Sequence, residues 1–332
     1  MVRQSLQFTT PHRAEIVEEP LPTPAAGQVL VATMISAISA GTELLFYRGQ
    51  LPIGVPVDST IASLSAPLHY PLRYGYACTG RVMACGTAVD TSWQDRLVFA
   101  FHPHTSHFLA QPSDLLPLPE GIIPEQAAFL PNMETAVNLV MDGRPVIGER
   151  VAVVGAGVVG LLVTALLARF PLADLRVVEP LAARRRLAEQ IGAIRTAAPD
   201  DFGSLNDAEA ADLTFELSGT PAGLDTAIAL TGFAGRIVIG SWYGEKRVAI
   251  DLGGRFHRSR IQLVSSQVST LAPMWSGRWD KARRLNVAWE MLKTVETAPL
   301  VTHRIPIAAA PSAYMLLDSA PQDAVQILLT YD

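Results

Sequence analysis

The chain has 332 residues, of which 49% are apolar and 17% charged; this length and composition predict two folded domains and exclude disorder as the main state. Its 26 Lys and Arg residues against 31 Asp and Glu residues give a formal net charge of −5, and the longest basic run is Arg184–Arg186. A broad basic face for nucleic acid is therefore not expected.

The N-terminal residues show no sign of export. They lack the apolar stretch that a signal peptide needs, and acidic residues begin at Glu15. Cys78 and Cys85 cannot build a disulfide framework, and we expect them to be buried or half-buried thiols. These features predict a cytoplasmic protein with no membrane partner.

Short alternating strands separated by turn residues are predicted from about Gln28 to Pro124, in the stretches QVLVATMISAIS, ACTGRVMACG and DRLVFAFHPHTSHFLAQ. This pattern is typical of a β-rich domain. Within it, Leu51–Pro71 carries four prolines and several serines, which predicts a long surface loop or a lid over a site.

After Pro124 helices and apolar strands alternate. RVAVVGA, LRVVEP, DLTFELSG and GRIVIGS are predicted strands, and VVGLLVTALLARF, LAARRRLAEQIGA and PAGLDTAIALTG are predicted helices. Continuous apolar strands that alternate with helices are typical of a parallel, doubly wound sheet, so the predicted fold class is α/β.

The C-terminal part contains a predicted helix, KARRLNVAWEMLKT, followed by two strands and one further helix. These last elements are too few to form a domain, so we expect them to pack on the β-rich domain. The predicted division is residues 1–131 and 268–332 for the β-rich domain and residues 132–267 for the α/β domain.

A G-x-G-x-x-G motif, Gly155–Gly160, lies directly between an apolar strand and an apolar helix. Gly155 permits the tight turn, Gly157 lets the backbone approach a pyrophosphate, and Gly160 lets the helix pack on the strand. The helix N-terminus, with Val158 and Val159, offers N–H groups to the phosphates. The motif also argues against a membrane helix at the uncharged run Val151–Ala168.

The strand after this motif ends in Glu179, whose carboxylate can bind the ribose hydroxyls of NAD and would repel the 2′-phosphate of NADP. NAD is therefore the expected cofactor, and NADP is less favoured. Arg184 can reach a phosphate or stack on adenine, or it can belong to a solvated helix face. Ser218 and Ser241 follow two later strands, where the nicotinamide half is expected or where ordinary turns occur.

This order of domains resembles the medium-chain dehydrogenase/reductase superfamily over nearly the whole chain. Ile38–Glu43 is similar to the family's Cys-Gly-Ser/Thr-Asp segment and Tyr74–Ala77 to its Gly-His-Glu segment, while Pro131–Thr135 occupies the segment that brings the third zinc ligand. The resemblance implies a GroES-like catalytic domain, a Rossmann domain and a homodimer.

The residues at the family's zinc positions depart from its pattern. Ala40 stands where the first zinc cysteine would be, Tyr76 where the zinc histidine would be, and no cysteine lies near Asn132. The structural zinc lobe, which needs four cysteines, is absent too. We therefore expect no metal. Ser39–Glu43 resembles the zinc-less branch that includes bacteriochlorophyllide a dehydrogenase-like proteins, and the chain also resembles zinc-type alcohol dehydrogenase-like proteins.

Without zinc, another group must handle the proton of the substrate hydroxyl. The resemblance places Thr42 at the family's proton-relay position and Glu43 and Tyr76 at or beside the vacated metal site. These three are the predicted catalytic residues, with Tyr76 as the direct contact. Alternatively, Thr42 bonds to the backbone, Glu43 forms a structural ion pair, and Tyr76 fills the volume of the metal.

Three histidines, His102, His104 and His107, lie close together in the sequence. Alternate residues of a strand project to one face, so these side chains can hold a metal or line the substrate cleft, and the cleft is the expected place.

Together these features predict a zinc-independent, NAD(H)-linked oxidoreductase that interconverts a hydroxyl and a carbonyl on a small molecule held between the two domains. One alternative is an NADPH-dependent quinone or enoyl reductase, because hydride delivery to a β-carbon needs little acid catalysis. An alternative of another class is a redox sensor that binds the dinucleotide without catalysis.

Overall fold

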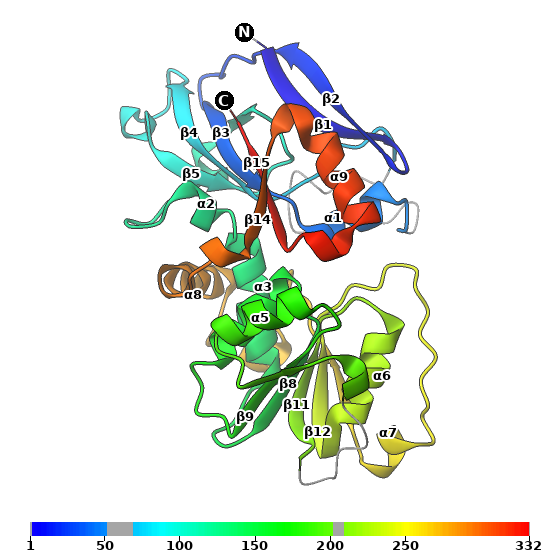
Figure 1. Cartoon of the computed structure of the whole chain (residues 1–332). Helices are drawn as coiled ribbons and strands as arrows, with labels where there is room; N and C mark the ends of the chain where they lie inside the picture. The colour runs from blue at the N-terminus through cyan, green and yellow to red at the C-terminus, as the bar shows by residue number, and fades with distance from the viewer. Residues whose placement is uncertain (1, 52–68, 202–208, 332) are drawn as a thin grey trace. The chain divides into compact units, whose positions relative to one another are not determined.

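The computed structural model describes residues 2–51, 69–201 and 209–331. The chain divides into two compact units, Met1–Pro131 with Glu296–Asp332, and Asn132–Val295 (Figure 1). The division at residue 132 is the predicted one, whereas the return to the first unit comes at residue 296 instead of 268. Most of the predicted loop Leu51–Pro71 lies outside the described residues.

Seven strands in the described part of the first unit form one sheet, in the order β14-β15-β3-β4-β5-β7, with β6 also paired to β3. The strands are β3 (Val29–Ala37), β4 (Cys78–Cys85), β5 (Leu97–Ala100), β6 (His107–Ala110), β7 (Leu116–Pro117), β14 (Val301–Pro306) and β15 (Gln326–Thr330). β15 pairs with β3, Leu328 lying opposite Ala37, so the end of the chain completes a sheet that begins near its start.

A hairpin and two helices cover part of this sheet. The hairpin is β1 (Val2–Thr10) with β2 (Arg13–Pro20), and the helices are α1 (Ala40–Tyr47) and α9 (Ala310–Ser319); a short helix, α2 (Pro124–Ala127), lies elsewhere in the unit. Leu6 of β1, Phe46 of α1 and Tyr314 of α9 meet in one buried apolar cluster. This cluster holds α1 through its buried residues Leu44–Tyr47, and the first turn of the same helix carries Thr42 and Glu43.

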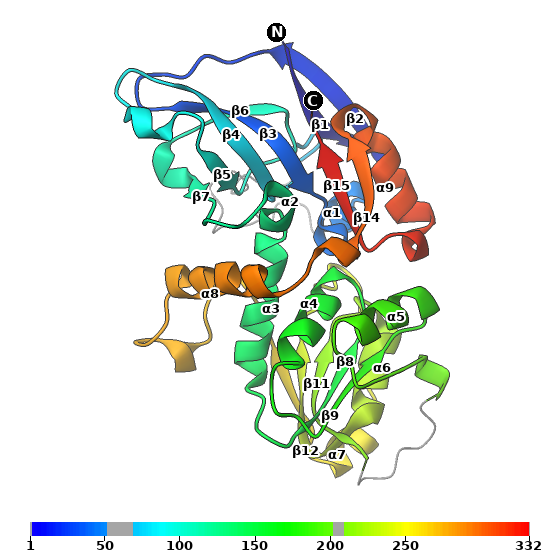
Figure 2. The same cartoon turned by 60° about the vertical axis from the view of Figure 1, so that its left-hand side comes forward.

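The second unit contains a six-stranded parallel sheet in the order β10-β9-β8-β11-β12-β13 (Figure 2). Its strands are β8 (Arg150–Val154), β9 (Asp174–Val178), β10 (Arg195–Ala197), β11 (Ala211–Glu216), β12 (Thr231–Ile239) and β13 (Gln262–Ser265). Numbered from β8, this is the order 3-2-1-4-5-6 of a doubly wound Rossmann sheet. The predicted α/β class is confirmed.

Helices pack against both halves of this sheet: α4 and α5 contact β8, β9 and β10, while α6 contacts β8, β11 and β12. The helices associated with this unit are α3 (Leu130–Gly143), α4 (Val158–Leu167), α5 (Ala182–Gln190), α6 (Pro221–Leu230), α7 (Arg255–Arg258) and α8 (Lys281–Thr294). The uncharged run Val151–Ala168 forms strand β8, the glycine loop and helix α4. None of the helices in the described part of the chain is long and apolar enough to cross a membrane.

Helix α8 is joined to α3 in the second unit through one buried arginine. The side chain of Arg284 is fully buried, and its Nε and Nη2 donate to Glu134 Oε1 of α3 at 3.1 and 2.8 Å. Arg284 also donates to Asn138. An unpaired buried guanidinium would be costly, so these bonds hold α8 on α3 and explain why the predicted boundary at residue 268 comes too early.

Candidate active site

The loop Gly155–Gly160 has the geometry of a dinucleotide-binding turn. Gly155 has φ +101°, and a Cβ there would lie 2.8 Å from the backbone of Leu217. A Cβ at Gly160 would lie 2.0 Å from the carbonyl oxygen of Gly155, so only glycine fits at either position. A Cβ at Gly157, in contrast, would meet no heavy atom within 4 Å. The loop thus leaves open space before α4, which suits a pyrophosphate.

Glu179, directly after β9, is attached to this loop. It is buried, its Oε2 accepts a hydrogen bond from Ala156 N at 2.8 Å, and its Oε1 accepts one from Leu181 N at 3.1 Å. A carboxylate has about four lone pairs in acceptor positions, so two donors leave capacity for ribose hydroxyls. Sequence and structure agree in bringing the glycine loop and Glu179 together.

Two arginines of α5 lie beyond Glu179. Arg185 Nη1 donates to the carbonyl oxygens of Glu179 and Pro180 at 2.7 and 2.8 Å, whereas Arg184 is half-buried on the same helix. Arg185 therefore holds the chain at the carboxyl end of β9, a role that sequence reasoning did not assign.

Ser218 and Ser241 also come together at the carboxyl edge of the sheet. Ser241 Oγ accepts from Gly219 N at 2.9 Å. Ser218 N and Oγ donate to Glu216 Oε1 at 2.8 and 2.6 Å, and Tyr243 OH donates to Glu216 Oε2 at 2.8 Å. Burial raises the pKa of Tyr243, and the charge of Glu216 adds to the shift.

The fully buried Glu216 was missed by sequence reasoning. Its signal was an acidic residue within the predicted strand DLTFELSG; in the structure it is the last residue of β11, one position short of the place that Glu179 takes after β9.

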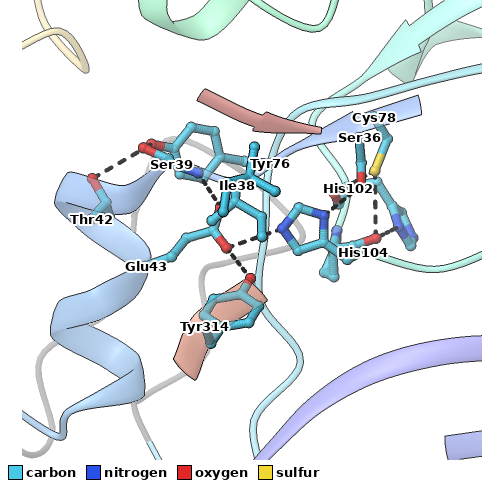
Figure 3. Close-up of polar contacts among 12 residues, drawn as sticks. Ser36, Ile38, Ser39, Thr42, Glu43, Tyr76, Cys78, His102, His104 and Tyr314 are labelled. Carbon is cyan, nitrogen blue, oxygen red and sulfur yellow. Dashed lines mark hydrogen bonds and ion pairs between the residues drawn. The ribbon is translucent and has the colours of Figure 1, made fainter. Parts of the chain in front are cut away.

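In the first unit, three hydroxyl groups meet where α1 begins (Figure 3). Tyr76 OH donates to Ser39 Oγ, and it lies 3.5 Å from Thr42 Oγ1. Ser39 is the N-cap residue of α1 and Thr42 lies in its first turn. We call Ser39, Thr42 and Tyr76 the hydroxyl cluster. Thr42 and Tyr76 are predicted catalytic residues. Ser39 was not predicted as a site residue, although it lies in the segment Ser39–Glu43 that carries the family resemblance.

Glu43 lies behind this cluster, inside the core. Its side chain is fully buried; Oε1 accepts from Ser39 N at 2.7 Å, and Oε2 accepts from Tyr314 OH and lies 3.0 Å from His104 Nε2. Burial raises the pKa of Tyr314 well above its ordinary value, and the neighbouring Glu43 charge raises it further. Both carboxylate oxygens thus have donors from the protein.

The sequence predicts that the three histidines share one face, and the structure shows that they do not. His104 is fully buried, with Nδ1 2.7 Å from Ser36 Oγ, so the expectation that it lines a cleft is wrong. The residues around it form an irregular turn, which removes the alternation of a strand. The His102 ring stacks on Phe108 at a centroid distance of 4.1 Å, and only His107 lies in a strand, β6.

The three positions that the resemblance matches to zinc ligands lie in different surroundings. Ala40 is the first residue of α1, Tyr76 belongs to the hydroxyl cluster, and Asn132 lies in α3. Within the described ranges, no group of three His, Cys, Asp or Glu side chains is arranged to hold a metal ion. Both cysteines are free thiols; Cys78 is buried and Cys85 half-buried, as predicted.

Comparison with known proteins places these features among dehydrogenases, although no family model matches the chain. D-Guloside 3-dehydrogenase of Escherichia coli K12 is 23% identical over 349 residues, which cover 99% of this chain and 100% of that protein. (R,R)-Butanediol dehydrogenase of Bacillus subtilis 168 is 29% identical over 263 residues, 68% of this chain and 73% of the relative.

Solved structures show the same fold. 2R,3R-Butanediol dehydrogenase of Bacillus subtilis superposes with a TM-score of 0.80 at 21% identity, covering 99% of this chain and 100% of the other. A dehydrogenase of Sinorhizobium meliloti 1021 bound to NADP superposes with a TM-score of 0.78 at 16% sequence identity, and 99% of each chain is covered. An alcohol dehydrogenase of Escherichia coli CFT073 in complex with NADH superposes with a TM-score of 0.77 at 19% sequence identity, again with 99% of each chain covered.

These neighbours confirm the predicted fold, a GroES-like domain together with a Rossmann domain. They leave the zinc-less branch without support, because the relatives found are of the zinc type. The chain's relatives in sequence and fold are alcohol and polyol dehydrogenases of the medium-chain dehydrogenase/reductase superfamily.

Proposed function

We propose that the chain is an NAD(H)-linked oxidoreductase that interconverts a hydroxyl and a carbonyl group on a small molecule without a catalytic zinc ion. One observation carries this proposal: the phenol of Tyr76, which stands where the resembling family has its zinc histidine, meets the hydroxyl groups of Ser39 and Thr42 in one cluster. The oxidoreductase class is supported by the relatives, which are named dehydrogenases.

The second unit has the residues to hold the cofactor. Gly155–Gly160 would bind the pyrophosphate, Glu179 the adenosine ribose, and the Ser218 and Ser241 region the nicotinamide half. When bound, the dinucleotide supplies or accepts the hydride. Structural neighbours have been solved with NADP and with NADH, and our preference for NAD rests on the acid at Glu179.

The side chains present do not fit a catalytic zinc. Such a site needs three protein ligands with N, S or O donors, and the methyl group of Ala40 offers none. The phenol oxygen of Tyr76 is instead hydrogen-bonded to Ser39 Oγ and lies 3.5 Å from Thr42 Oγ1.

The hydroxyl cluster can take over the proton. In the reductive direction, Tyr76 OH donates a proton to the substrate oxygen while the carbonyl carbon gains hydride. The phenolate that remains accepts hydrogen bonds from Ser39 Oγ and Thr42 Oγ1 and regains a proton from solvent. In the oxidative direction the same atoms take the proton from the substrate hydroxyl.

The test is the Tyr76→Phe variant, assayed with NAD⁺ and a panel of three compounds that appear in the names of similar dehydrogenases: (R,R)-butanediol, L-threonine and galactitol 1-phosphate. We expect kcat to fall about a hundredfold, because the proton donor is lost, while NADH affinity stays the same. An unchanged kcat would remove Tyr76 from the mechanism. A marked preference for NADPH would favour a quinone or enoyl reductase instead.

A further inference from the structure

The hydroxyl cluster is carried by two segments that are distant in the sequence, and His104 contacts both. Ser39 and Thr42 belong to the start of α1, and Tyr76 lies just before β4. The side chain of His104 reaches Glu43 of α1, with Nε2 3.0 Å from Oε2. Its backbone N–H donates to the carbonyl oxygen of Tyr74 at 3.2 Å. His104 therefore joins the two segments (Figure 3).

The segment that carries Tyr76 packs closely on the imidazole ring. Gly75 has φ +125°, and a Cβ at this position would lie 2.7 Å from Cδ2 and 2.8 Å from Nε2 of His104. No side chain fits in that space, so the backbone of Gly75 lies directly against the ring. The ring itself is fully buried, which means that Tyr76 has a rigid support one residue away.

Glu43 connects the same ring to the other half of the cluster. The carboxylate contacts His104 Nε2 through Oε2 and accepts from the backbone N–H of Ser39 through Oε1. Ser39 Oγ in turn accepts from Tyr76 OH. A continuous series of contacts thus runs from His104 through Glu43 and Ser39 to the phenol that we propose as the proton donor.

The far side of the ring determines where its proton sits. Nδ1 lies 2.7 Å from Ser36 Oγ, and Ser36 Oγ lies 2.7 Å from Tyr331 OH. With a neutral ring, one arrangement satisfies every group: Tyr331 donates to Ser36, Ser36 donates to Nδ1, and Nε2–H donates to Glu43. A buried polar network of this kind is stable only when each member has its partner, so it favours a single geometry for the carboxylate.

We propose that His104, a neutral imidazole with its proton on Nε2, is a positioning residue that sets the orientation of the hydroxyl cluster through Glu43 and through the backbone of residues 74–76. This proposal rests on the proposed function, since the cluster is where that function places the proton transfer.

The kinetic test compares His104→Leu with His102→Leu, a matched change two positions away at a ring that stacks on Phe108 and whose Nδ1 lies 2.9 Å from the carbonyl oxygen of Pro103. With the panel alcohol that the wild type oxidises fastest, we expect His104→Leu to lower kcat about tenfold or more with KM within about twofold. His102→Leu should keep the wild-type kcat. His104→Gln, which can still donate to Glu43, should recover part of the loss.

A double variant separates positioning from general damage. If His104 acts through Tyr76, adding His104→Leu to Tyr76→Phe should cause little further loss of kcat. Independent, multiplying losses would overturn the role of His104 while leaving the proposed function intact. An unchanged kcat in Tyr76→Phe alone would instead overturn the proposed function.

A second measurement needs neither substrate nor variant activity. Nitrogen-15 NMR of the histidine-labelled wild-type protein, with His104→Gln used to assign the signal, should show a neutral His104 ring protonated on Nε2 at neutral pH. A ring protonated on Nδ1, or on both nitrogens, would contradict the proposed network.

Discussion

The sequence predicts the place of Tyr76 in the candidate site but not the partners of its neighbour Glu43. Its place in the segment Tyr74–Ala77, and that of Thr42 in Ile38–Glu43, were predicted by resemblance, and the structure brings the two side chains within hydrogen-bond distance. The partners of Glu43 could not be predicted. His104 and Tyr314 lie 61 and 271 residues from it along the chain, and no local pattern reports a contact of that range.

The histidine motif failed for a related reason. The spacing of His102, His104 and His107 indicates one shared face only if the chain is a regular strand there. The backbone of residues 101–106 turns instead, with His104 N bonded to Tyr74 O and Ser106 N bonded to Gln4 O. Side chains that are neighbours in the sequence therefore enter different environments.

His102 gives a pH-dependent contribution to stability. Burial lowers the pKa of His102 from an ordinary value of 6.5 to about 4. Below pH 6.5 the unfolded chain binds a proton that the folded chain rejects until about pH 4, so the free energy of unfolding falls across this range. The shift corresponds to at most about 3 kcal/mol.

The measurement is urea unfolding at pH 7 and pH 4.5 for the wild type and His102→Leu. The variant cannot titrate at this position, so we expect it to lose about 1–3 kcal/mol less than the wild type over this change of pH. His257→Leu, at an exposed histidine of α7, serves as the control and should behave like the wild type. If the wild type and His102→Leu lose the same free energy of unfolding between pH 7 and pH 4.5, His102 does not contribute to the pH dependence of stability.

At the scale of elements, the glycine loop was the part best predicted from sequence. Its strand, turn and helix are consecutive, so the roles of Gly155, Gly157 and Gly160 follow from local geometry. The acid Glu216 was missed because its role depends on Tyr243 and on the loop that carries it, which no periodicity describes.

Two glycine variants should separate folding from cofactor binding. Gly160→Ala places a methyl group 2.0 Å from Gly155 O and should lower the free energy of unfolding by about 2 kcal/mol or more. Gly157→Ala meets no protein atom within 4 Å and should cost about 1 kcal/mol or less, yet weaken NADH binding at least about tenfold. Fluorescence titration and urea unfolding of both variants measure the two effects. Unchanged NADH affinity in Gly157→Ala would place the pyrophosphate elsewhere.

At the scale of the whole molecule, the alternation of strands and helices predicted two domains and the return of the C-terminus to the first. The exact return point depends on Arg284, whose partners Glu134 and Asn138 lie 150 and 146 residues earlier. A buried arginine within an amphipathic helix looks like any surface arginine in the sequence, so the boundary could not be placed from composition.

The resemblance also implies a homodimer, and β13 is a free edge of its six-stranded sheet among the described strands. Pairing with a second copy would cover that edge. Light scattering should give a mass twice the 35.7 kDa of the chain. Ser266 N donates to Ile239 O of β12, so the N–H groups of alternate residues such as Val264 face β12 and that of Ser265 faces the free edge. Ser265→Pro is therefore the variant that should shift the mass to that of a monomer. A monomeric wild type would contradict this prediction.

The central claim, dehydrogenation without zinc, is tested most directly by measuring metal content and activity on the same sample. Purified protein would be treated with a chelator, analysed for zinc, and assayed with NAD⁺ and the alcohol panel. We predict far less than one zinc ion per chain and a kcat that the chelator leaves unchanged. One zinc ion per chain, with activity that the chelator removes and added zinc restores, would contradict the account.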